Sequence, residues 1–291
     1  MVALRQAAWE GAMDGSDQHG KAPAHDFVEP VPVEAPEPLV VHLLPGTGTR
    51  LVVSLAGVGR VRNATPPPEF LGTASGAGEN HVLFISDISR SWLNGPEVAE
   101  NIVALIEGYR AEHGIDEVVL MGNSMGGFAA LMLAQLTEVD TVIALAPQFS
   151  MNPDLVPEET RWRHWMLQIA EWRFPAVAGL ERDRTRYFIF HGSHPAEARH
   201  WLRFPWHRGL NHFVFHGLGH DLAARMRKRR LLGRVIDACI AGKSRQVRLA
   251  LERSFLGRRF EVSRREAYQP AHPELTLDPG GAPVVVPEGA A

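Results

Sequence analysis

Short apolar runs alternate with longer stretches in which apolar residues recur at helical spacing, and this pattern predicts strands and helices in turn. Strands are expected over seven segments: Leu39–Leu44, Arg50–Leu55, 82–86, 118–121, Thr141–Leu145, 186–190 and 213–215. Helices are expected over five others: 94–113, 127–136, 196–203, 221–241 and 243–256. The turn cluster Pro45-Gly46-Thr47-Gly48 separates the first two strands, so we expect these strands to form a hairpin.

The alternation of strands and helices after this hairpin indicates an α/β domain with a mostly parallel central sheet and helices on both faces. The two ends of the chain differ from this pattern. Residues 1–38 end in a proline-spaced acidic run and are predicted to form a flexible, Pro-rich arm that ends in an edge strand. We therefore expect the domain over 39–242, a helix within 243–267 and a disordered, proline-containing tail over 268–291.

The segment Gly122-Asn123-Ser124-Met125-Gly126-Gly127 lies between a predicted strand and a predicted helix. A G-x-S-x-G pattern in this context is typical of a nucleophile elbow. The serine of such a turn is strained, and its neighbours must lack side chains for the turn to close, which Gly122 and Gly126 satisfy. We expect Ser124 at the N-terminus of the helix, where developing negative charge is favoured. The alternative is a chance match in a chain with 27 glycines.

This elbow and the order of elements resemble the α/β-hydrolase family over about residues 39–242. In that family the nucleophile, the acid and the histidine follow successive strands in this chain order. The resemblance implies an α/β-hydrolase fold with a small cap, here at about residues 150–183. It also implies a serine esterase, acyl hydrolase or acyltransferase that forms an acyl-enzyme and needs no cofactor.

The family places its histidine after the last strand, and two histidines compete there. His220 follows Gly217-Leu218-Gly219 and matches the family's G-x-G-H pattern, so it is the predicted base. His216 lies at the end of the strand, where a packed histidine is expected. The family's glycine-x-x-aspartate would put the acid at Pro195, and the next carboxylate is Glu197, which we take as the predicted acid. Two further carboxylates are alternatives: Asp183 and Asp221.

An oxyanion hole needs two backbone N–H groups aimed at the tetrahedral oxygen. The resemblance assigns one to Met125, which follows the nucleophile, and one to Val58 in Ala56-Gly57-Val58, a variant of the family's His-Gly-x. A glycine-rich turn without this role is the alternative.

Substrate contacts are expected from loops at the same edge of the sheet. The segment Asp87-Ile88-Ser89-Arg90-Ser91-Trp92-Leu93-Asn94 follows a strand and combines polar groups with a tryptophan that we expect to be exposed. A packed loop is an equal alternative. The segment weakly resembles hydrolase-like proteins associated with polysaccharide or glycan modification, which implies a preference for carbohydrate-linked esters. The residues expected to contact substrate are Gly57, Asp87, Trp92 and, from the cap, Trp165.

Composition narrows the function classes further. The formal net charge of −3 gives no reason to expect nucleic acid, and the phosphate-binding glycine motifs are missing. The single cysteine, Cys239, fits a reducing compartment, and the chain lacks a signal-peptide pattern and an apolar run long enough for a membrane span. A soluble, cytoplasmic protein is therefore expected, and the oligomeric state is open.

Three other interpretations stay open at this level. The first is a zinc site built from His191, His194, Glu197 and His200, although Pro195 interrupts any helical spacing. The second is a catalytically silent hydrolase scaffold that acts as a binding protein. The third concerns the basic run at 225–230, which is either a solvated helix face or a site for an anionic partner.

Overall fold

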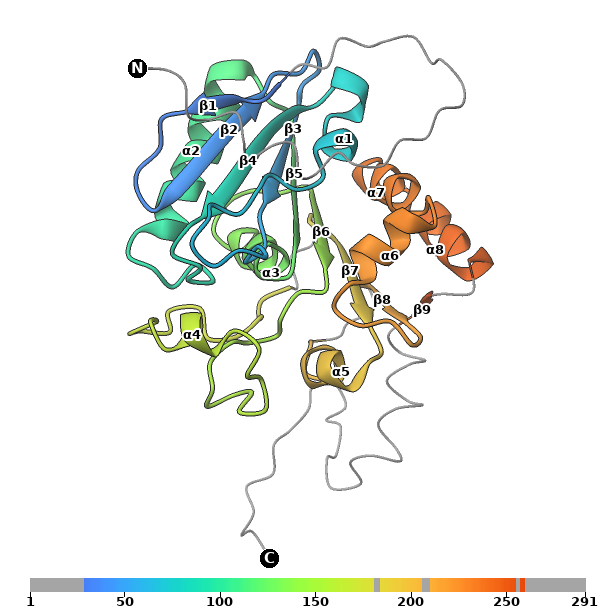
Figure 1. Cartoon of the computed structure of the whole chain (residues 1–291). Helices are drawn as coiled ribbons and strands as arrows, with labels where there is room; N and C mark the ends of the chain where they lie inside the picture. Colours follow the sequence, from blue (N-terminus) through green and yellow to red (C-terminus); the bar gives the residue numbers. More distant parts are fainter. Residues whose placement is uncertain (1–28, 181–183, 206–209, 255–256, 260–291) are drawn as a thin grey trace, which may run out of the picture.

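The computed structural model describes residues 29–180, 184–205, 210–254 and 257–259. In these residues one sheet of nine strands forms the centre of the molecule (Figure 1). In spatial order its strands are β1 (Val31–Val33), β2 (Leu39–Leu44), β4 (His81–Asp87), β3 (Arg50–Leu55), β5 (Glu117–Asn123), β6 (Thr141–Leu145), β7 (Arg186–Gly192), β8 (Asn211–Phe215) and β9 (Gly257–Arg259).

The strands from β4 to β8 run parallel to one another, whereas β1, β2 and β9 pair antiparallel with their neighbours. β6 is buried at every position and β5 at its five central positions. Helices cover both faces of a parallel sheet, so its central strands read as continuous apolar runs. The predicted fold class, an α/β-hydrolase fold with a mostly parallel sheet, is confirmed.

The expected hairpin between the first two apolar strands is wrong, because β4 lies between β2 and β3. The turn at residues 45–48 packs against the chain that enters β4. The Thr47 amide donates to the Gly78 carbonyl at 3.1 Å, and a Cβ on Gly46 would lie 2.3 Å from the carbonyl carbon of Asn80. β3 is buried along most of its length and gains a parallel partner on each side in this order, which a hairpin would not provide.

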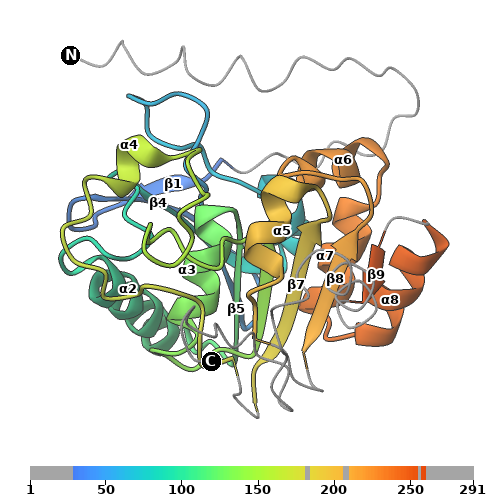
Figure 2. The ribbon, with the colours of Figure 1, turned by 90° about the horizontal axis from the view of Figure 1, so that it is seen from below.

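The helices form two layers, one on each side of the sheet (Figure 2). Their bounds are α1 (Leu71–Ala74), α2 (Val98–His113), α3 (Met125–Leu133), α4 (Arg163–Met166), α5 (Pro195–Trp201), α6 (Leu222–Lys228), α7 (Leu232–Ile240) and α8 (Ser244–Arg253), with a 3₁₀ turn at Gly76–Gly78. Side chains of successive strand residues point to opposite faces. Accordingly Val53 packs with the α2–α3 layer, and Val52 packs with α1 and α6–α8.

The ends of the domain differ in detail from the expectation. The edge strand predicted for the arm is β1, and residues 1–28 lie outside the described part. The helix expected within 243–267 ends at Arg253, and the chain then returns to the sheet as β9, beside β8. The stretch 221–241 is two helices, with Arg230 between them at φ 55°. The predicted tail at 268–291 is also outside the described residues.

Residues 150–180 pack on the α2–α3 side of the sheet and contain one short helix, α4. This is the expected cap segment. Figure 1 shows α4 and α5 at the same end of the sheet. Among the described helices, none combines the length and apolarity that a membrane span requires.

Candidate active site

Ser124 occupies the turn between β5 and α3 and has a strained backbone, with φ 58° and ψ −120°. Its amide donates to the Leu145 carbonyl on β6 at 2.8 Å, and its carbonyl accepts the first bond of the helix from Phe128 at 3.0 Å. A non-glycine residue in such a conformation costs roughly 1–3 kcal/mol, and such residues cluster at functional sites. The turn therefore has the geometry expected of a nucleophile elbow.

The two glycines of the motif are required by close backbone contacts. A Cβ on Gly126 would lie 2.0 Å from the carbonyl oxygen of Leu55 on β3. A Cβ on Gly122 would lie 2.3 Å from the carbonyl carbon of Gly126. Both contacts are with backbone atoms, which cannot rotate away. The close approach of α3 to β3 and β5 thus depends on the absence of side chains at these positions.

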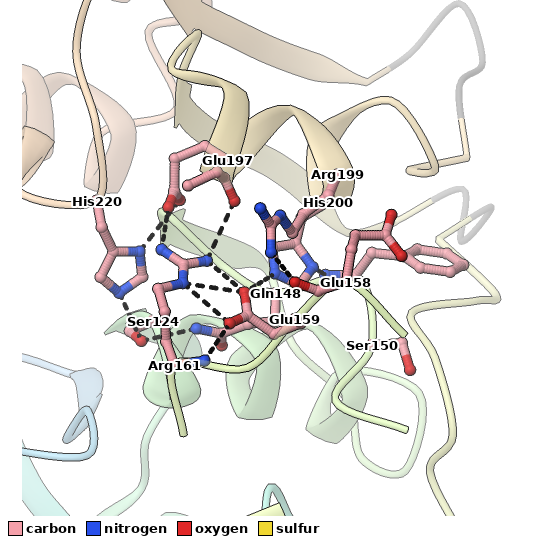
Figure 3. Close-up of polar contacts among 12 residues, drawn as sticks. Ser124, Gln148, Ser150, Glu158, Glu159, Arg161, Glu197, Arg199, His200 and His220 are labelled. Carbon is pink, nitrogen blue, oxygen red and sulfur yellow. Dashed lines mark hydrogen bonds and ion pairs between the residues drawn. The ribbon is translucent and has the colours of Figure 1, made fainter. Parts of the chain in front are cut away.

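The structure brings the predicted nucleophile, base and acid together in one hydrogen-bonded chain (Figure 3). His220 Nε2 lies 2.9 Å from Ser124 Oγ, and His220 Nδ1 lies 3.1 Å from Glu197 Oε2. The residues come from the loops or helices that directly follow β5, β7 and β8. Of the alternatives, His216 is exposed, Asp221 pairs with Arg225 at 2.8 Å, and Asp183 is outside the described residues.

Glu197 lies in the first turn of α5 and is almost fully buried. Burial alone would raise its pKa. The hydrogen bond with His220 and the positive charge of Arg161 outweigh burial and lower the pKa of Glu197 to about 2. The carboxylate is therefore ionised at neutral pH, which suits an acid that orients an imidazole and stabilises its protonated form.

A second set of charged groups, which the sequence analysis did not identify, extends from Glu197 into the cap segment. Arg161 forms ion pairs with Glu197 and, at 2.6 Å, with Glu159, and Glu159 contacts His200 Nε2 at 2.9 Å. Glu159 and His200 are almost fully buried. Burial alone would raise the pKa of Glu159, but the hydrogen bonds with His200 and Arg161 hold it well below its usual value. The cap is thereby tied to the predicted acid by charged pairs.

The cap also touches the predicted base. The Trp162 ring lies 5.0 Å from that of His220, and the Arg161 guanidinium lies 4.5 Å from the centre of the Trp162 ring. No motif in residues 159–162 marks these contacts in the sequence.

Two backbone segments lie beside Ser124, where the donors of an oxyanion hole are predicted. Met125 is the first residue of α3, so its N–H has no partner within the helix. A Cβ on Gly57 would lie 3.7 Å from Ser124 Cβ, so the loop after β3 passes close to the nucleophile. Arg90 Nε donates to the Val58 carbonyl at 2.9 Å and holds this loop. Met125 and Val58 thus stay the predicted donors.

Asp87 and Trp92 face inward, so the expected exposure of Trp92 is wrong, and their contact with substrate stays a prediction. The Asp87 carboxylate accepts from the amides and hydroxyls of Ser89 and Ser91 at 2.5–2.9 Å. Trp92 is 1% exposed, not the exposed tryptophan that the sequence suggested. The loop turns through residues with positive φ, and this turns the indole into the protein. Gly57 lies against Ser124, and Trp165 is half-buried under Arg90, 4.5 Å from the guanidinium.

The four residues considered as zinc ligands have other partners and do not converge. His191 Nε2 contacts the Pro147 carbonyl at 2.7 Å, and His200 contacts Glu159. His194 Nδ1 accepts from the Ala196 amide at 3.2 Å, and Glu197 is engaged by His220. Within the described residues no group of His, Cys, Asp and Glu side chains has the arrangement of a metal site.

The fully buried His191 predicts a pH-dependent stability. Burial lowers its pKa from 6.5 to about 3, so the folded protein keeps this side chain neutral while the unfolded chain takes up a proton below pH 6.5. We expect the free energy of unfolding to fall between pH 6.5 and pH 3, by up to roughly 1.4 kcal/mol per pH unit from this residue. Urea unfolding at several pH values measures this slope.

The matched variants for this prediction are His191→Gln and His216→Gln. Glutamine at 191 can donate to the Pro147 carbonyl and accept from His212 Nε2, which lies 2.8 Å from His191 Nδ1 in the wild type. It should make the slope shallower, whereas the exposed His216→Gln should leave it unchanged. Equal slopes in the wild type and His191→Gln would contradict the prediction.

Comparisons with known proteins agree with this architecture. The family model of serine aminopeptidase S33 matches residues 88–197, a stretch shorter than half of the chain. No protein with a curated function matches the sequence.

Three solved structures illustrate the likeness of the fold. The capsule O-acetyltransferase of Neisseria meningitidis serogroup A is 12% identical, with 74% of this chain and 97% of that chain covered and a TM-score of 0.51. An α/β serine hydrolase without a lid from Xanthomonas campestris is 15% identical, with 81% and 97% covered and a TM-score of 0.46. A serine hydrolase homologue from Coxiella burnetii is 14% identical, with 70% and 95% covered and a TM-score of 0.47. Together with the sheet order and the elbow, the first of these structures shows that the chain has the α/β-hydrolase fold.

Proposed function

We propose that this protein is a serine hydrolase or acyltransferase that acts on a carboxylic ester through an acyl-enzyme on Ser124. One observation carries the proposal. Ser124, His220 and Glu197, far apart in the sequence, form a continuous hydrogen-bonded chain at a strained elbow. A serine hydroxyl is a weak nucleophile until an oriented base removes its proton, and this chain supplies both the base and the orienting acid.

In the proposed mechanism Ser124 Oγ attacks the acyl carbon and His220 Nε2 takes the hydroxyl proton. Glu197 stabilises the imidazolium that forms, and the Met125 and Val58 amides donate to the oxyanion. The C–O bond to the leaving alcohol then breaks, and the alcohol departs with the proton from His220. Water or an acceptor hydroxyl then attacks the acyl-enzyme, and His220 takes its proton. His220 returns the proton to Ser124 Oγ as the acyl group leaves the serine.

The finer part of the proposal is an ester linked to a carbohydrate. Its support is the weak resemblance of the loop at residues 87–94 to glycan-modifying hydrolases. A shared fold with a protein described as a capsule O-acetyltransferase is compatible with this substrate class. Because Asp87 and Trp92 face inward, Trp165 is the more accessible aromatic side chain among the predicted substrate contacts.

A fluorophosphonate probe tests the proposal, because it reacts covalently with activated serines. We expect the wild type to be labelled, with mass spectrometry placing the adduct on Ser124, and Ser124→Ala to be unlabelled. The control Ser244→Ala changes a serine at the start of α8, outside the candidate site, and should label like the wild type. A folded wild-type protein that stays unlabelled would contradict the proposal and favour a hydrolase scaffold that serves in binding.

A further inference from the structure

Ser124 Oγ has a second hydrogen-bond partner besides His220. Gln148 Nε2 lies 2.8 Å from Ser124 Oγ, and His220 Nε2 lies 2.9 Å from the same atom (Figure 3). Gln148 follows β6 and is fully buried. The side-chain amide of Gln148 is therefore shielded from water and contacts the atom that is proposed to react.

The orientation of this amide follows from its other partner. Trp92 Nε1 lies 3.1 Å from Gln148 Oε1. An indole nitrogen can only donate, so the amide oxygen must face Trp92 and the NH₂ group must face Ser124. Ser124 Oγ therefore accepts from Gln148.

The contact between His220 and Glu197 fixes the direction of the other two hydrogen bonds. The ionised carboxylate of Glu197 can only accept, so His220 Nδ1 carries the proton, and in the neutral imidazole Nε2 then accepts the proton of the Ser124 hydroxyl. The donors thus all run in one direction, from Trp92 through Gln148, Ser124 and His220 to Glu197. This is the protonation state in which the serine is ready to lose its proton to the base.

The loop that carries Trp92 is built at the cost of backbone strain. Arg90, Trp92 and Leu93 have φ values of 52°, 49° and 64°, a region that residues with side chains rarely adopt. Hydrogen bonds to the Asp87 carboxylate, and bonds from Asn94 Nδ2 to the Ser91 and Trp92 carbonyls at 3.1 and 2.9 Å, hold it in place. Strain of this kind persists where the surroundings enforce it, often at functional sites. Here it places the indole N–H against Gln148.

We propose that Gln148 is a catalytic residue whose amide stabilises negative charge on Ser124 Oγ, and that Trp92 is the positioning residue that orients this amide. The inference rests on the proposed function, because it concerns the same reacting atom. It adds a donor on the serine oxygen itself, distinct from the donors to the substrate oxyanion.

In the proposed reaction, negative charge develops on Ser124 Oγ twice in each catalytic cycle. During acylation Oγ loses its proton to His220 Nε2 as its bond to the acyl carbon forms. During deacylation that bond breaks, the electron pair returns to Oγ, and Oγ regains a proton from His220. The ester oxygen of the acyl-enzyme is a weaker acceptor than an oxygen that carries negative charge. The hydrogen bond from Gln148 therefore strengthens toward both transition states, which is the condition for catalysis.

The test uses the full-length protein and a p-nitrophenyl acetate burst assay, with kcat, KM and thermal stability measured for each variant. Gln148→Glu keeps an acceptor for Trp92 but loses the donor toward Ser124. Gln148→Met has a similar length and no polar group. We expect both to lower kcat about 100-fold, the lower end of the range seen when one transition-state donor is lost, with KM nearly unchanged. Gln246→Met, on the exposed surface of α8, is the control and should behave like the wild type.

Trp92→Phe keeps an aromatic ring and removes the N–H that orients the amide. It should also lower kcat, by a smaller factor than the Gln148 variants, and leave KM unchanged. If neither Gln148 variant folds, Trp92→Phe tests the proposal. A folded Gln148→Met or Trp92→Phe protein that keeps wild-type kcat would overturn the inference while Ser124 labelling still supported the proposed function. A folded wild type without labelling or turnover would overturn both.

Discussion

Replacing His220 with alanine should lower kcat/KM for a short p-nitrophenyl ester by about 10⁵- to 10⁶-fold, equivalent to roughly 7–8 kcal/mol of transition-state stabilisation. Ser124 Oγ has two side-chain partners in the described structure, and Gln148, oriented by Trp92, can only donate to it. Loss of His220 therefore leaves the hydroxyl without the base on which the mechanism depends. Steady-state turnover of the purified variant measures the effect.

The matched control is His216→Ala, a change to an exposed histidine in the same loop, and we expect wild-type turnover from it. The double variant Ser124→Ala/His220→Ala should lose little more activity than either single variant, because residues that act as one unit are strongly non-additive. If His220→Ala kept a tenth of the activity, another group would have to act as the base.

Replacing Gly126 with alanine should prevent stable folding. The added Cβ would lie 2.0 Å from the Leu55 carbonyl oxygen and 2.7 Å from its carbonyl carbon. These are main-chain atoms of β3, which is paired on both sides in the sheet, so relief requires α3 to move away from β3. We expect a loss of more than about 4 kcal/mol in the free energy of unfolding, which is a large part of the stability of a typical domain.

The control for this prediction is Gly108→Ala, in the interior of α2, where an added Cβ meets no atom within 4 Å. This variant should be more stable than the wild type by about 0.5–1 kcal/mol, because alanine favours the helix over glycine. Circular dichroism during urea or thermal unfolding compares the two variants. A Gly126→Ala protein that unfolds like the wild type would show that α3 is not packed on β3 as described.

The network around Arg161 connects the cap segment to the predicted catalytic acid. Arg161 pairs with Glu197 while Trp162 packs against His220, so one short segment touches two members of the predicted triad. A displacement of this segment would separate the Arg161 guanidinium from Glu197 and the Trp162 ring from His220 at the same time.

The sequence by itself determined the features that depend on neighbours in the chain. The apolar runs identified most of the strands, and the strand–glycine–helix context identified the elbow. The glycines before His220 and the place of Glu197 after β7 pointed to two side chains that the structure brings within hydrogen-bond distance. In these cases a few adjacent residues determine the local backbone. The fold class then gives the order in which the predicted nucleophile, acid and base follow one another along the chain.

Only the tertiary structure decided the contacts between residues that are far apart in the chain. β4 lies between β2 and β3, where the turn at residues 45–48 suggested a hairpin, because strand order depends on which strands pair with the two edges of β3. Trp92 turned inward because of backbone conformations that its residue types do not favour. Gln148 meets Ser124 and Trp92 across 24 and 56 residues, and Arg161 meets Glu197 across 36. No local pattern encodes these pairs, because their positions are set by the order of strands in the sheet and by how the loops after those strands pack together.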